Sequence, residues 1–271
     1  MGAGSTTRTG PARGSCAEGQ RSGRAACNDA YAFARVLILV NKDSRAPFAL
    51  PASVPLVAPD GFSTRLAEVG APVSASTLAQ LGDYLGRMLA MNEHMNLTGI
   101  KDPESAWERH VLDALTLLPL LAELPAGARV VDVGSGGGIP GVPLAIARPD
   151  LRVTLVEATQ KKAAFLSAVS AAMGLANIEV RAERAEQVGA GELRGTFDVV
   201  IARAVARLIT LAPLTLPLAR PAGGVILLIK GQKADEELAE AATIMKRQRI
   251  VHERTVATPT GRIVVLRPRA G

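Results

Sequence analysis

The stretch Val130-Val131-Asp132-Val133-Gly134-Ser135-Gly136-Gly137-Gly138-Ile139-Pro140-Gly141 decides how this chain folds. Its β-branched residues predict a buried strand, the glycines predict a tight loop, and Pro140 suits the first turn of a helix. Because glycine has no Cβ, such a loop lets a ligand approach the backbone at a helix N-terminus. The loop alone does not name the ligand. Gly136-x-Gly138-x-x-Gly141 also matches the dinucleotide-binding fingerprint, which is weak evidence by itself.

Composition indicates a globular protein with a mild basic excess. Of 271 residues, 48% are hydrophobic and 21% charged, and aromatic residues make up only 3%, which argues against a base-stacking platform. The net charge of +6 suggests an acidic partner such as nucleic acid. Half of that charge falls in residues 1–60, where seven Lys/Arg against four Asp/Glu leave +3. The rest of the chain is therefore only weakly basic.

Residues 1–60 are rich in Gly, Ala, Ser, Arg and Pro and show no sustained hydrophobic period, which predicts a disordered or transit-like extension, or a start site placed too far upstream. The apolar run Tyr31–Val40 is a poor signal peptide, because the basic region before it is too long. Cys16 and Cys27 are the two cysteines, so a reducing, cytoplasmic location is expected. We expect no metal site and no membrane span, since neither ligand clusters nor long apolar runs occur.

Two helices are predicted before the glycine stretch, and residues 61–125 are assigned to an N-terminal helical cap. Ser76 is the expected N-cap of the first helix, whose apolar stripe is Leu78, Leu81, Leu85, Met88 and Leu89. Asp102-Pro103-Glu104 starts the second with a capping carboxylate, a first-turn proline and an acid at the positive end of the dipole. Its buried face is predicted to carry Trp107, Val111, Ala114, Leu115 and Leu118.

Residues 126–271 alternate strands and helices, which predicts a parallel sheet covered on both faces. The expected strands are 129–133, 153–157, 178–181, 197–202 and 224–229, and the expected helices are 140–147, 159–173, 208–218 and 235–249, with Gly174 as a C′ glycine. Two further strand-like runs, 251–256 and 262–266, are joined by a short turn. Such a turn joins antiparallel strands, so the sheet is expected to end in a hairpin.

Ligands of such sheets bind beyond the carboxyl ends of the strands, so the residues there are candidates for the site. Glu157, at the end of the second strand, is expected to accept ribose hydroxyls. Glu186, in a polar turn after the third strand, is a candidate for an adenine amino group, with a solvated loop as the alternative. Arg203, after the fourth strand, either faces a base or forms a salt bridge to Glu157 or Glu186. Lys230 follows the fifth strand.

No residue typical of a general acid or base in hydride transfer is expected at the carboxyl ends of these strands. His94, His110 and His252 are the three histidines and none ends a strand, and no Tyr-x-x-x-Lys pair occurs. Hydride transfer usually needs such a group. A ribose-binding acid, a second acid, an arginine and no base suit methyl transfer from S-adenosylmethionine, where alignment of the reactants is the main task.

The chain resembles the GidB/RsmG family of bacterial 16S rRNA guanine-N7 methyltransferases over about residues 62–268. The resemblance rests on several motifs in the family's order and spacing. They are Met95–Thr98, Arg109–Asp113, Asp132–Gly141, Lys161-Lys162 with Phe165-Leu166, Ala185-Glu186, Ile201–Ala204 and Lys230–Gln232. Together they are specific, although most are not specific singly.

The resemblance implies a class I S-adenosylmethionine-dependent methyltransferase fold with a Rossmann-like seven-stranded sheet whose last strand is antiparallel. The residues that it implies for the cofactor are Gly134, Ile139, Ala185, Glu186 and Arg203, with Glu157 on the ribose. Gly136 of the glycine loop is a further candidate for the cofactor. The implied substrate is a guanine of 16S rRNA or of the small ribosomal subunit, methylated at N7 without a general base, so no catalytic residue is assigned. Candidate RNA contacts are Arg109, His110, Lys161, Lys162, Arg203 and Lys230.

Three alternatives stay open at this point. An NAD-dependent oxidoreductase would explain the literal fingerprint, and a non-catalytic ribosome-assembly factor would explain the fold. Methylation of a small molecule would suit the low net charge of the body. Detection of NADH binding in place of S-adenosylmethionine binding distinguishes the first from the rest.

Overall fold

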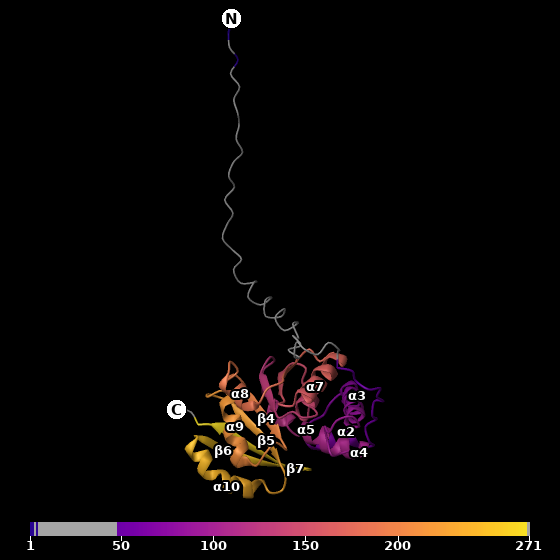
Figure 1. Ribbon diagram of the computed structural model, residues 1–271, viewed down its shortest axis with the longest axis vertical. Helices are drawn as coiled ribbons and strands as arrows, with labels where there is room; N and C mark the ends of the chain where they lie inside the picture. The colour runs from indigo at the N-terminus through magenta and orange to yellow at the C-terminus, as the bar shows by residue number, and fades with distance from the viewer. Residues whose placement is uncertain (3, 5–47, 270–271) are drawn as a thin grey trace. The chain divides into compact units, whose positions relative to one another are not determined.

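The predicted strands pair into one seven-stranded mixed sheet, ordered β3-β2-β1-β4-β5-β7-β6, in the computed structural model, which describes residues 1, 2, 4 and 48–269 (Figure 1). The strands are β1 (Arg129–Val133), β2 (Arg152–Val156), β3 (Ile178–Arg181), β4 (Val199–Arg203), β5 (Val225–Lys230), β6 (Ile250–Thr258) and β7 (Gly261–Pro268). Strands β1 to β5 are mutually parallel, and β7 runs antiparallel between β5 and β6. The predicted terminal hairpin and the antiparallel last strand are confirmed.

The strand register brings the predicted site segments to one edge. Val133, the last residue of β1, pairs with Val156 at the end of β2 and with Ala202 near the end of β4. Arg203 pairs with Ile229, so β5 ends at the same edge. The glycine loop and Glu157, which follow β1 and β2, therefore lie at the same edge as Arg203 and Lys230, the last residues of β4 and β5.

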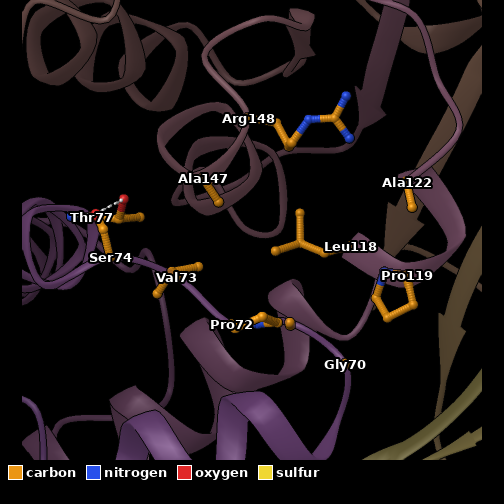
Figure 2. Close-up of a pocket in the computed structure, with 11 residues that line it drawn as sticks. Gly70, Pro72, Val73, Ser74, Thr77, Leu118, Pro119, Ala122, Ala147 and Arg148 are labelled. Atoms are coloured by element: carbon orange, nitrogen blue, oxygen red, sulfur yellow. Dashed lines mark hydrogen bonds between the residues drawn. The ribbon is translucent and has the colours of Figure 1, made fainter.

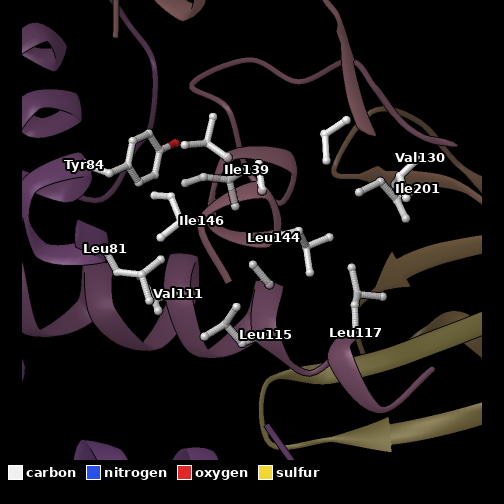
Figure 3. Packing of buried hydrophobic residues seen from close by; sticks show 14 of the residues in the cluster. Leu81, Tyr84, Val111, Leu115, Leu117, Val130, Ile139, Leu144, Ile146 and Ile201 are labelled. Carbon is white, nitrogen blue, oxygen red and sulfur yellow. The ribbon is translucent and has the colours of Figure 1, made fainter. Parts of the chain in front are cut away.

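Alternating strand residues point to opposite faces of the sheet and build two cores. On one face Val130, Val153, Val199 and Ile201 are buried beneath the helices that precede β1 and the helices α6 (Gly141–Ala147) and α7 (Gln160–Ala172). Figure 3 shows this packing, with Leu81 and Tyr84 near Ile139 and Ile146. On the other face lie Val131, Val133, Val200, Ala202, Ile226 and Leu228, beneath α8 (Ala185–Ala190), α9 (Leu208–Thr215) and α10 (Ala234–Arg247). Burial on both faces explains why these strands are almost uniformly apolar.

Within residues 48–128, the helices before β1 are more numerous than the two predicted. They are α2 (Phe62–Glu68), α3 (Ala75–Asn92), α4 (Pro103–Ala106), the π-helical turn η1 (Trp107–Leu112), α5 (Asp113–Leu115) and the 3₁₀ turn η2 (Leu118–Leu121). The predicted cap Ser76 is wrong: Ser74 caps α3, because it is extended and its hydroxyl accepts from the Thr77 N–H. Asp102 caps α4 as predicted, accepting from the Ser105 N–H.

The later helices are α6 (Gly141–Ala147), α7 (Gln160–Ala172), α8 (Ala185–Ala190), α9 (Leu208–Thr215), the 3₁₀ turn η3 (Leu216–Leu218) and α10 (Ala234–Arg247). Gly174 has φ +66° just after α7, as a C′ glycine does. Two expectations are corrected. Ala185-Glu186 begins helix α8 and is not a turn, and the single helix expected over 208–218 is divided into α9 and η3.

Part of the predicted extension packs on the folded chain. Leu56 donates its N–H to the Gly82 carbonyl of α3, and a Cβ on Gly82 would lie 2.1 Å from the Leu56 carbonyl oxygen. The predictions for Tyr31–Val40, Cys16 and Cys27 fall outside the described residues. The helices that the structure describes include none of the length and apolarity needed to cross a bilayer.

Candidate functional site

The glycine loop turns the chain from β1 into α6 over a very short distance. Gly134 has φ +72°, a conformation that residues with a Cβ rarely adopt. Gly141 is required for a different reason: a Cβ there would lie 2.3 Å from Leu155 Cδ2 and 2.8 Å from Asp132 Oδ2. The third glycine of the fingerprint thus serves close packing of α6 on the sheet.

The glycines divide into a buried and an accessible group. Gly137 and Gly138 are buried, and the Tyr84 hydroxyl donates to the Gly137 carbonyl at 2.6 Å. Gly134 and Gly136 are half-buried, and a Cβ on Gly136 would meet nothing closer than a carbonyl oxygen at 3.9 Å. The accessible face of the loop is therefore at Gly134 and Gly136.

Glu157 lies directly beside this accessible face. Its Oε2 accepts from the Gly136 N–H at 2.9 Å, and its Oε1 accepts from the Thr159 N–H at 2.7 Å. The residue is only 7% exposed, so it is not a solvated surface acid. A carboxylate oxygen has two lone pairs, so each oxygen can still accept one hydroxyl hydrogen.

Asp132 is fully buried behind the loop. Its Oδ2 accepts from the Gly141 N–H at 3.1 Å, whereas Oδ1 has no hydrogen-bond partner among the described residues. Burial raises the pKa of this carboxyl to about 7, against the lowering effects of Gly141, Ser135 and Arg203. A cationic ligand near the loop would favour its charged form.

Arg203 is held by the helical segment before β1. Its guanidinium donates to the Arg109 carbonyl at 2.6 Å and to Asp113 Oδ2 at 3.0 Å, and it contacts His110 Nδ1 at 3.2 Å. The ion-pair partner is therefore Asp113, not Glu157 or Glu186, which were the alternatives drawn from the sequence. The Arg203 side chain is 20% exposed, so one side of it still reaches solvent.

These contacts fix the tautomer of His110. Arginine only donates, so His110 Nδ1 must accept, and the hydrogen sits on Nε2, which lies 2.9 Å from Thr98 Oγ1. Burial and the charge of Arg203 lower the pKa of His110 to about 4, which keeps the ring neutral. His110 thus has both ring nitrogens engaged and is not a free base.

The π-helical turn η1 explains how these groups converge. Its wider hydrogen bonding, seen in the Asp113 N–H donating to the Glu108 carbonyl, rotates the residues that follow relative to an α-helix. Arg109, His110 and Asp113 consequently all reach Arg203. Single π-turns inside helices are frequent at functional sites.

The other predicted contact residues lie in diverse surroundings. Ile139 and Ala185 are buried, and Glu186 is exposed in the first turn of α8. Arg109 and Lys161 are exposed, whereas Lys162 is half-buried. His110 is 2% exposed, and the Lys230 side chain is 9% exposed in an ion pair with Glu237. The candidate RNA contacts therefore do not form one uniform exposed rim.

The structure adds four residues that sequence reasoning missed: Tyr84, Thr98, Asp113 and Thr260. Asp113 accepts from both Arg203 and the Thr260 hydroxyl of the β6–β7 turn. Tyr84 was not in the predicted stripe of α3, although its spacing of three residues from Leu81 was an available signal. Thr98 and Asp113 fall within the motifs Met95–Thr98 and Arg109–Asp113, which gave no sign of their contacts, and Thr260 carried no signal.

A separate pocket of about 340 Å³ opens among the segments before β1 and the end of α6. Figure 2 shows Leu118 between Ala147 and Pro72, with Arg148 above. The Arg148 guanidinium already has partners within the chain, because it donates to the Leu121 carbonyl at 2.7 Å and forms an ion pair with Asp150. No predicted site residue lines this pocket.

The strand order, the antiparallel β7 and the glycine loop at the switch point define a class I methyltransferase, whose cofactor is S-adenosylmethionine. The open side of the loop and the carboxylate beside it fit that group. The chain belongs to the GidB family, described as rRNA small subunit methyltransferase G, whose model matches residues 77–264. That match decides between the two interpretations of the glycine loop in favour of S-adenosylmethionine.

Relatives agree with the family. The ribosomal RNA small subunit methyltransferase G of Sorangium cellulosum is 65% identical over 225 residues, covering 83% of this chain and 94% of the relative. The protein of the same name from Moorella thermoacetica is 42% identical over 176 residues, covering 65% and 72%. Among solved structures, an S-adenosylmethionine-dependent methyltransferase from Aquifex aeolicus is 20% identical with a TM-score of 0.47, covering 61% of this chain and 93% of that one.

Proposed function

We propose that this chain methylates N7 of a guanine in 16S rRNA of the small ribosomal subunit. One observation carries the proposal beyond the family: the histidine that contacts Arg203, His110, has both ring nitrogens in hydrogen bonds and is buried. A reaction that needs no general base suits this arrangement. Guanine N7 has an in-plane lone pair and no hydrogen, so no proton must leave before attack.

The residues proposed for the cofactor are Gly134, Gly136, Ile139, Glu157, Ala185, Glu186 and Arg203. S-adenosylmethionine supplies a methyl group on a positively charged sulfur when bound. Glu157 is oriented by the backbone N–H groups of Gly136 and Thr159, which leaves lone pairs for the ribose hydroxyls. Glu186 projects from the first turn of α8 and suits an exocyclic amine.

Arg203 is proposed as the group nearest to both cofactor and guanine. Asp113 and His110 hold one side of its guanidinium, so the planar group is preorganised to stack on a base or to donate to it. Arg109 and Lys161 are exposed and suit phosphate contacts. His110 and Lys230 are buried, so we propose that they act through neighbouring residues and not on RNA directly.

The division into residues 1–60, an N-terminal helical cap at 61–125 and a methyltransferase part at 126–271 remains a proposal. The helices of the proposed cap share one core with the sheet, which supports a role in shaping the site. A substrate in the ribosomal small subunit supports a cytoplasmic location.

The proposed function is tested by transfer of tritiated methyl groups onto small-subunit rRNA, followed by mapping of the modified position. The substrates to compare are naked 16S rRNA, an assembled small subunit and large-subunit rRNA as the control. We expect label at one guanine N7 of the small-subunit RNA, detected by strand scission at the labile site. Label on a ring carbon, an exocyclic amine or a ribose would contradict the N7 assignment.

A further inference from the structure

The turn between β4 and α9 is strained and lies over the glycine loop. We define the β4–α9 turn as residues 203–207. Ala204 has φ +55°, which is unusual for a residue with a Cβ. Val205 follows it, is 39% exposed, and places its Cγ2 2.7 Å from the point where a Cβ on Gly134 would sit. The turn thus puts an exposed apolar side chain at the accessible face of the loop.

One partly buried ion pair contacts the backbone on both sides of Arg207 in this turn. Lys230 Nζ donates to the Ala206 carbonyl at 2.8 Å and pairs with Glu237 Oε2 at 2.7 Å. The same Glu237 oxygen accepts from the Leu208 N–H at 2.9 Å. The pair therefore binds one backbone acceptor and one backbone donor that flank Arg207.

This ion pair is distinguished by its hydrogen bonds. The side chains of Lys230 and Glu237 are 9% and 16% exposed, and although burial opposes ionisation, the hydrogen bonds from Lys230 and the Leu208 N–H lower the pKa of Glu237. A second pair joins the β4–α9 turn to α10 on the surface, Arg207 with Glu240 at 2.6 Å, with side-chain exposures of 61% and 45%. The inner pair differs from it by its contacts to the backbone of the turn.

We propose that Lys230 and Glu237 are positioning residues for methyl transfer, which hold the β4–α9 turn so that Val205 and Arg203 stay at the mouth of the cofactor loop. The proposal rests on the proposed function for its catalytic part. Strained backbone persists only where its surroundings over-determine it. Arg203 is anchored by Asp113 on one side of Ala204, and Lys230 with Glu237 anchors the other side.

The first test measures the turn without any reaction. Amide hydrogen exchange at Leu208 is compared in wild type, Glu237→Met, Glu237→Gln and Glu240→Met. Methionine at 237 removes the acceptor of the Leu208 N–H, so exchange should accelerate about tenfold or more. Glutamine keeps an acceptor, and Glu240→Met removes an equal charge from the same helix, so both should exchange within about threefold of wild type. An unchanged exchange rate at Leu208 in Glu237→Met would overturn the proposal that Glu237 holds the β4–α9 turn.

The second test separates binding from turnover. In Lys230→Met and Glu237→Met, kcat on small-subunit RNA should fall about tenfold to a hundredfold, because a displaced turn misaligns the reactants. The KM for RNA and the Kd for S-adenosylmethionine should stay within about twofold of wild type. Glu240→Met should keep the wild-type kcat. A purely structural pair would change the melting temperature and leave kcat of the folded enzyme unchanged, which would overturn the proposal.

The two proposals fail in distinguishable ways. If wild type transfers no methyl group to small-subunit RNA, the proposed function fails. The exchange test still shows whether Glu237 holds the β4–α9 turn. If the methionine variants do not fold, Glu237→Gln replaces them, since it breaks the ion pair and keeps the Leu208 contact. Its kcat should fall about threefold, and a wild-type kcat would overturn the role of the pair.

Discussion

The Tyr84 hydroxyl of α3 donates a 2.6 Å hydrogen bond to the Gly137 carbonyl, 53 residues further along the chain. Tyr84 is fully buried, and burial raises the pKa of its phenol well above the usual range, so the hydroxyl stays a donor at all working pH values. Helix α3 therefore fixes the buried side of the glycine loop at Gly137.

Tyr84→Phe should lower both stability and cofactor affinity. The Gly137 carbonyl loses its donor inside the core, which costs about 1–3 kcal/mol of unfolding free energy. A looser loop should weaken S-adenosylmethionine binding about threefold to tenfold, measured by calorimetry. Thr215→Val is the matched control, because it removes a buried hydroxyl that bonds only within α9. That variant should lose stability and keep the wild-type Kd; equal Kd values for all three proteins would contradict the prediction.

Gly136→Ala tests which face of the loop meets the cofactor. Its φ of +56° makes alanine cost about 1–2 kcal/mol, and the added methyl group would project into open space. Gly127 has φ +80°, also with open space around it, in a turn before β1. Both substitutions should lower the urea midpoint similarly, but Gly136→Ala alone should weaken S-adenosylmethionine binding at least tenfold, about 1.4 kcal/mol. Wild-type affinity in Gly136→Ala would place the cofactor elsewhere.

Arg203→Ala should lower kcat/KM for methylation about a hundredfold, because the oriented guanidinium is lost. It also leaves Asp113, 7% exposed, as a buried charge without its partner, which costs about 3–5 kcal/mol. The double variant Arg203→Ala with Asp113→Asn removes that charge and should regain part of the stability without regaining activity. Wild-type methylation by Arg203→Ala would refute the assignment of this residue.

The pKa of His110, about 4 in the folded chain against 6.5 unfolded, predicts a pH-dependent stability. Between these values the unfolded chain binds more protons, so this contribution is complete above pH 6.5 and is lost as the pH falls toward 4. Asp132, with its pKa raised to about 7, makes the folded protein more stable as the pH falls. The pH dependence of wild-type stability therefore combines two opposite contributions.

The difference in unfolding free energy between wild type and His110→Asn isolates the histidine. Asparagine keeps an acceptor for Arg203 and does not titrate. The unfolding free energy of wild type minus that of His110→Asn should fall by up to about 1.4 kcal/mol per pH unit as the pH is lowered from 6.5 to 4.5. Urea unfolding measures both free energies. A difference that stays constant over this range would show that His110 is protonated in the folded protein.

The sheet was predictable because its residues carry local signals. Apolar runs such as Val130–Val133 end in glycine or charged residues, and the turn before Gly261 is too short for a parallel crossover. The N-cap of α3 was misplaced because Ser74 and Ser76 both carry the required hydroxyl, and only the backbone at Ser74 is extended. Helix α8 was missed because Ala185–Ala190 is too short to show a helical period.

The site was predictable only in its strand-end residues. Glu157 and Arg203 were candidates because both lie at the carboxyl edge of the sheet, Glu157 just after β2 and Arg203 as the last residue of β4. Their partners were not predictable, since the Arg203–Asp113 contact spans 90 residues and depends on the π-turn η1. Lys230 was assigned to RNA from its charge, whereas its carbonyl and carboxylate partners come from the packing of α9 and α10 against β5.

The contact between Asp113 and Thr260 joins two parts of the chain that are synthesised at different times. Asp113 is synthesised before β1, whereas Thr260 and strand β7, which separates β5 from β6, are synthesised only after β6. A nascent chain halted before β7 has the glycine loop and Arg203 but lacks one anchor of Asp113 and leaves β5 as an open edge. The carboxylate that orients Arg203 therefore gains its second partner only when the hairpin of β6 and β7 has formed.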